Sequence, residues 1–137
     1  MKHHSVISSK LFLLRQIFFI SLWVSSSVSA HAILAQSEPK VDSTIDVSPQ
    51  QIGIWFNENV ASEFKALAVI NSAGKRVDNQ DVKQAALDRT HIYVTVPRLL
   101  PDKYTVRYRV MSADTHIVTG RFTFTVTPPE TAAIETN

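Results

Sequence analysis

The sequence predicts an all-β fold, an antiparallel β-sandwich made of short strands. Apolar and polar residues alternate in several segments that are rich in Val, Ile, Tyr, Phe and Thr, a pattern typical of half-buried strands. Proline, glycine and asparagine residues separate these segments, and no long helical pattern lies between them. Short strands at this spacing favour two packed antiparallel sheets.

The expected strands follow one another through residues 31–127. The first is expected at residues 32–36, and the others lie where alternation or an apolar run is clearest: 52–56, 66–70, 91–96, 104–110 and 121–126. Residues 81–88 fit either a helical turn or a loop. Residues 128–137 begin with two prolines and are expected to form a flexible polar tail.

Each expected strand has one face that should be buried. Residues 66–70 are wholly apolar, whereas in the strands expected at 52–56, 91–96, 104–110 and 121–126 every second residue is apolar and can face the core. The residues expected to point into the core are Ile52, Ile54 and Phe56; Ile92, Val94 and Val96; Tyr104, Val106, Tyr108 and Val110; Phe122, Phe124 and Val126.

Residues 1–30 are expected to be a signal peptide that is removed. Lys2 and Lys10 give a basic beginning, an apolar stretch follows, and Val28-Ser29-Ala30 suits a signal peptidase. The most apolar part, residues 17–24, is shorter than the roughly 20 residues that a spanning helix needs. Cleavage after Ala30 would leave an exported domain, residues 31–137, that is not embedded in a membrane.

Removal of this segment also removes the positive charge of the chain. The whole sequence has 14 Lys and Arg against 12 Asp and Glu, whereas residues 31–137 hold 11 against 12. This near-neutral balance gives no electrostatic case for binding nucleic acid. The chain has no cysteine, so an exported domain must be stable without disulfides and offers no thiolate to a metal.

Three residues form a candidate metal site. A chain beginning at His31 would offer an α-amine and an imidazole, and Asp114-Thr115-His116 supplies a carboxylate and a second imidazole. If an extended strand continued through this second segment, Asp114 and His116 would point to the same side. Several nitrogen donors with one oxygen suit a tetragonal Cu(II) ion. Taken singly, each signal is weak and is more typical of ordinary surface residues; the three residues together carry the prediction.

Three segments together resemble the CopC copper-resistance family, with the short YobA-like members the most similar in layout. They occur in the family's order and cover nearly all of residues 31–127. They are His31-Ala32-x-Leu34 followed by Ser37-x-Pro39; Ile54-x-Phe56-x-Glu58-x-Val60; and residues 104–126, which contain Ser112-x-Asp114-Thr115-His116 and Gly120-x-Phe122-x-Phe124-x-Val126.

The resemblance implies an immunoglobulin-like, Greek-key β-sandwich of about seven strands that binds one Cu(II) ion per chain in the periplasm. The implied ligands are His31, Asp114 and His116. Glu58 would lie outside the ligand shell, bind weakly on the axis, or remain a solvated carboxylate. The implied role is non-catalytic: copper tolerance, homeostasis, or delivery to a separate inner-membrane importer of the CopD type.

The chain departs from the family pattern beside both parts of the site. Thr115 stands where the family has glycine, and a β-branched residue would be strained there if the position requires a positive φ. Asn57 and Asn59 flank Glu58 in place of serine and proline. These changes keep the ligand types but affect the geometry.

Two other functions are compatible with these features. An N-terminal histidine with a second histidine also defines copper monooxygenases that act on polysaccharides, and a metal-free interaction module could use the same fold.

Met111 is the only methionine of residues 31–137, so a Cu(I) site with several thioethers is not expected. Met111 is expected to pack in the interior, and His91 is expected at the surface without a ligand role.

Overall fold

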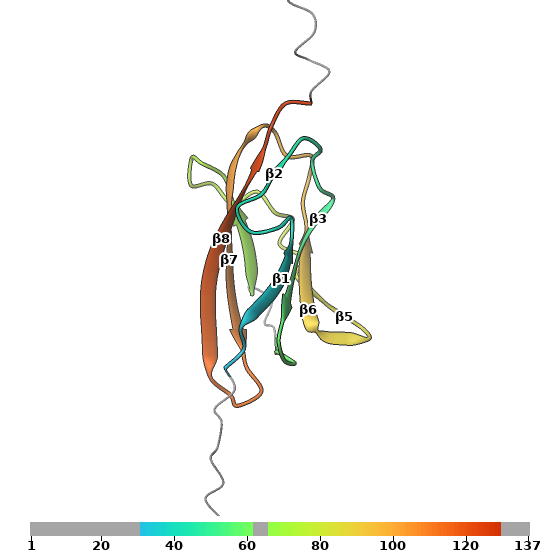
Figure 1. The fold of residues 1–137 in the computed structure, drawn as a ribbon, viewed down its shortest axis with the longest axis vertical. Coiled ribbons are helices and arrows are strands. Elements are labelled where there is room, and N and C mark those ends of the chain that lie inside the picture. The colour runs from blue at the N-terminus through green and yellow to red at the C-terminus, as the bar shows by residue number, and fades with distance from the viewer. Residues whose placement is uncertain (1–30, 62–65, 130–137) are drawn as a thin grey trace, which may run out of the picture.

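Two four-stranded sheets pack face to face in the computed structural model, which describes residues 31–61 and 66–129 (Figure 1). The expected signal peptide and most of the expected polar tail lie outside these residues. No helix long and apolar enough to cross a membrane occurs within the described ranges.

The predicted β-sandwich is confirmed. The first sheet has the order β1-β3-β6-β5, formed by β1 (Leu34–Glu38), β3 (Gln51–Phe56), β6 (Asp88–Thr95) and β5 (Lys83–Ala85). The second sheet has the order β2-β8-β7-β4, formed by β2 (Thr44–Ile45), β8 (Ile117–Val126), β7 (Asp102–Met111) and β4 (Leu67–Ile70).

Three details differ from the prediction. The described residues form eight strands, and the short β2 pairs with β8 in parallel, so the sandwich is not wholly antiparallel. Strand β1 begins later than expected, because Ile33 bonds to Asn57 before the regular ladder starts. Residues 81–88 contain β5 and a turn, with the Asp81 carboxylate accepting hydrogen bonds from the backbone and side chain of Thr95.

The core lies between the sheets, where the alternating residues meet. Every residue expected to point inward is buried except Tyr108, which is half-buried. Full burial of each large aliphatic side chain contributes about 1.5–3 kcal/mol. Tyr108 lies across Gly120 on the neighbouring strand, so any Cβ at position 120 would overlap its ring.

The first sheet carries an aromatic stack on its outer face. The rings of Trp55 and His91 are 3.9 Å apart and inclined by 12°, and Tyr93 lies beside His91 at 5.4 Å. His91 is therefore half-buried rather than a free surface residue, because Trp55 covers it. Its Nε2 atom is buried without a hydrogen-bond partner among the described residues.

Asp78 ties β4 to the turn that follows it. Its carboxylate is buried and accepts hydrogen bonds from Val69 N at 2.8 Å, Gln80 N at 3.0 Å, and two guanidinium nitrogens of Arg76, each at 2.8 Å. Burial alone would raise the pKa of Asp78, but the hydrogen bonds from Arg76, Val69 and Gln80 outweigh it. The pKa of Asp78 therefore lies below its ordinary value.

We expect Asp78→Ala to lower the free energy of unfolding by about 3 kcal/mol at neutral pH, because Arg76 and two backbone N–H groups lose their buried acceptor. A depressed folded-state pKa gives stability that is complete above the unfolded-state pKa and is lost as pH falls through the folded-state pKa. Urea unfolding over an acid series should show the two proteins converging in stability. A gap that stays constant throughout the series would contradict this role.

Candidate metal centre

The three candidate ligands meet at one end of the sandwich, where the chain enters β1 and where β7 turns into β8 (Figure 1). One ligand atom from each of His31, Asp114 and His116 lies within 4.8 Å of the other two. The two imidazole centroids are 5.2 Å apart, and Asp114 Oδ2 is 2.9 Å from His116 Nδ1. The fold thus brings together residues from opposite ends of the domain.

A turn, rather than a continuing strand, aims Asp114 and His116. Residues 112–116 link the strands, with Ser112 N donating to the carbonyl of His116 at 2.9 Å and Thr115 N donating to that of Ser112 at 3.0 Å. The expectation that an extended strand aligns the two ligands is therefore wrong. Thr115 has a φ of 69°, a left-handed conformation that strains a β-branched residue.

Ser112 holds the carboxylate of Asp114 in place. Ser112 is buried, and its hydroxyl donates a hydrogen bond to Asp114 Oδ1; the backbone N–H of His116 donates to the same oxygen at 3.3 Å. The hydrogen bond from Ser112, followed by the contact with His116, holds the pKa of Asp114 well below its ordinary range. The sequence alone indicates no role for Ser112, although its place two residues before Asp114 suits a hydrogen-bonded turn.

The loop after β3 connects both parts of the site. Ile33 N donates to Asn57 Oδ1 at 2.7 Å, and Asn57 N donates to the carbonyl of Ile33 at 3.0 Å. On the other side, Ala113 N donates to Glu58 Oε1 at 3.3 Å. Asn57 thus fixes the segment that carries His31, a role that its residue type alone did not reveal. Glu58 braces the turn and is not part of the three-residue ligand group.

The ligand group is open to solvent. His31 is exposed, and the side chains of His116 and Asp114 are 63% and 27% exposed. Two imidazoles and a carboxylate suit Cu, Zn and other late divalent metals, with copper at the top of the affinity order. His31 gains an α-amine only if the bond to Ala30 is cut.

Met111 is more exposed, and His91 more covered, than the sequence predicts. Met111 was expected to pack in the interior, but it is 39% exposed because it is at an outward-facing position where β7 ends. His91 lies in β6 against Trp55 and is not part of the ligand group.

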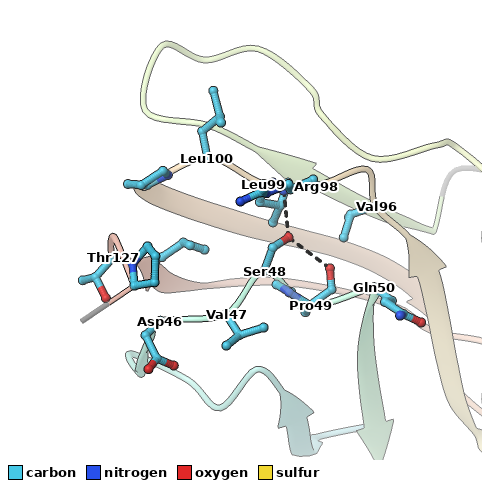
Figure 2. Close-up of a pocket in the computed structure, with 13 residues that line it drawn as sticks. Asp46, Val47, Ser48, Pro49, Gln50, Val96, Arg98, Leu99, Leu100 and Thr127 are labelled. Atoms are coloured by element: carbon cyan, nitrogen blue, oxygen red, sulfur yellow. Dashed lines mark hydrogen bonds between the residues drawn. The ribbon is translucent and has the colours of Figure 1, made fainter. Parts of the chain in front are cut away.

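A hollow lies at the end of the sandwich opposite the candidate metal ligands, and its lining differs from that group. It has a volume of about 490 Å³ and is lined by the segment before β3, the β6–β7 connection and the end of β8. Figure 2 shows Ser48 between Leu99 and Pro49, with Ser48 Oγ accepting a hydrogen bond from Leu99 N at 2.8 Å. No histidine lines this hollow.

Comparison with known proteins identifies the family. The CopC domain family matches residues 34–127, as the sequence resemblance predicted. Over 99 residues, the chain is 37% identical to copper transport protein CutJ of Bacillus subtilis, covering 71% of this chain but only 18% of CutJ. It is 30% identical over 104 residues to protein YobA of Escherichia coli, covering 75% of this chain and 84% of YobA.

A solved structure agrees with this assignment. The crystal structure of CopC from Methylosinus trichosporium OB3b superposes with a TM-score of 0.67 at 30% sequence identity, covering 73% of this chain and 97% of that one. The family and its named members support a copper-related function for the chain.

We expect Thr115→Gly to raise the free energy of unfolding by about 1 kcal/mol, because glycine relieves the backbone strain at φ 69°. The greater conformational entropy of glycine in the unfolded chain offsets only part of this stabilisation. Thr119→Gly is the matched control, since Thr119 lies in the regular part of β8 and glycine there should destabilise. Thermal unfolding of both variants makes the comparison. Equal destabilisation by the two substitutions would show that Thr115 is not strained.

Proposed function

The chain belongs to the CopC domain family, and we propose that it is a periplasmic protein that binds one Cu(II) ion per chain as cargo. The observation that carries this proposal is the convergence of ligand atoms from His31, Asp114 and His116 within 4.8 Å. Its role would be copper tolerance, homeostasis or delivery to a separate inner-membrane importer of the CopD type.

The donor set fits the proposed cargo. After cleavage, His31 would bind through its α-amine and imidazole, His116 through its imidazole, and Asp114 through a carboxylate oxygen. The amine and imidazoles must lose their protons to bind, and Cu(II) competes with protons best among the common divalent ions. The negative charge of Asp114 would offset part of the metal charge.

The surroundings of the ligands suit a carrier. Ser112 and the backbone of His116 fix the Asp114 carboxylate, whereas the exposed imidazole of His116 leaves one side of the site open. A partly preformed, open site can take up and release an ion without unfolding. We assign Glu58 to the support of this site, because its carboxylate accepts from the turn that carries Asp114.

We expect His116→Ala to weaken Cu(II) binding by at least about 100-fold and Ser112→Ala to weaken it by about tenfold, since loss of a ligand exceeds loss of a group that orients one. Competition titration with a Cu(II) chelator measures both. His91→Gln is the matched histidine control and should retain the wild-type affinity. Unchanged affinity in His116→Ala would overturn the proposed ligand set, and an unchanged melting temperature with Cu(II) would favour a metal-free module.

We expect the copper-loaded protein to oxidise neither chitin nor cellulose with ascorbate beyond the level of His116→Ala. An anionic Asp114 ligand favours Cu(II) over Cu(I), so it opposes the reduction that such oxidation requires. Product analysis by mass spectrometry tests this expectation. Oxidised sugars formed by the wild type but not by His116→Ala would establish a monooxygenase instead.

A further inference from the structure

The outer face of the second sheet carries a row of cations, here called the basic face. Their alternating neighbours on β7 and β8 point into the core. All four cations are exposed on the opposite side, and together they are four of the 11 cations of residues 31–137. The basic face consists of Lys103, Arg107, Arg109 and Arg121.

The cations of the basic face lie close together, and none of them forms an ion pair with an acid among the described residues. Arg107 is directly opposite Arg121 in the β7–β8 ladder, an arrangement in which like charges destabilise a sheet. The ion pairs of Arg76 with Asp78 and of His116 with Asp114 involve other cations, so neither pair neutralises the basic face.

Two acids beside this sheet face accept hydrogen bonds from neutral groups. Asp42 accepts a hydrogen bond from Thr123 Oγ1 at 2.7 Å. Asp102 accepts from Ser72 N at 3.2 Å and from Lys103 N at 2.7 Å. The positive charge of the face is therefore available to an external anion.

A shallow hollow and two exposed apolar residues on the basic face indicate which class of anionic partner it could bind. A shallow hollow of about 300 Å³ brings Lys103, Arg107 and Arg121 to one place beside the turn after β4. Along the same outward face, Met111 and Ile117 pair at the metal end and are 39% and 49% exposed. A cationic sheet face with an exposed apolar pair at its edge suits a lipid headgroup layer, which is anionic and adjoins an apolar interior.

We propose that the basic face docks on a membrane surface rich in anionic phospholipids. The cations meet the phosphate groups, and Met111 and Ile117 enter the boundary between headgroups and acyl chains. An acidic protein segment could neutralise the cations, but it would not explain why Met111 and Ile117 are exposed beside them. Because Met111 and Ile117 adjoin the turn at residues 112–116, this orientation places the metal centre at the edge of the membrane contact.

Vesicle co-sedimentation tests the proposal with the purified chain, without copper. We expect binding to phosphatidylcholine vesicles that contain phosphatidylglycerol, no binding to pure phosphatidylcholine, and loss of binding at high ionic strength. The double variant Arg107→Thr/Arg121→Thr should lower the partition coefficient by about 30-fold, at about fivefold for each cation. It should not lower the melting temperature, because it removes a like-charge pair and introduces a residue that favours strands.

The matched control is Lys83→Thr/Arg89→Thr, which removes two exposed cations from the first sheet. It should bind vesicles as the wild type does. Equal loss of binding in both double variants would mean that net charge alone is responsible, and it would overturn the proposal. Binding to immobilised polyglutamate without binding to anionic vesicles would assign the face to an acidic protein instead. Neither result would affect the copper titration.

Discussion

Strands β7 and β8 pair over ten residues, from Asp102 opposite Val126 to Met111 opposite Ile117. This register sends one set of alternating side chains into the core and the opposite set, including the four cations of the basic face, outward. It also sets the length of the turn at residues 112–116. A slip by one residue would exchange the two faces and change that turn, so the core, the metal centre and the basic face all depend on one hairpin.

The candidate metal centre combines a local part, the turn with Asp114 and His116, and a distant part, His31. Asp114 and His116 are aligned within the turn by Ser112, whereas His31 depends on the hydrogen bonds between Ile33 and Asn57. The turn keeps Thr115 in a left-handed conformation that costs on the order of 1–3 kcal/mol, which the surrounding ladder can sustain. The carboxylate is thus oriented by the hairpin itself, and binding should need little rearrangement of that part.

The alternation of apolar and polar residues predicted the long strands, because successive side chains of a half-buried strand point in turn to the core and to solvent. Ile52 and Val106 are examples of the core-facing residues. Alternation missed β2 and β5, which are too short to show a period, and it gave no sign that β2 pairs in parallel. The residues of the candidate metal centre could be proposed from the sequence, but the turn that aims Asp114 and His116 could not, since it follows from hydrogen bonds of Ser112. The role of Asn57 depends on a contact between segments distant in sequence and therefore leaves no local pattern.

The proposed copper site depends most on His31, which would bind the ion through both its α-amine and its imidazole. Electron paramagnetic resonance during Cu(II) titration tests it most directly, comparing exported protein whose intact mass shows a chain starting at His31 with the same protein carrying one alanine before His31. We predict a nitrogen-rich tetragonal spectrum and tight binding for the first protein, and an altered spectrum with weaker binding for the second. Identical spectra and affinities, or an exported chain that does not start at His31, would contradict it.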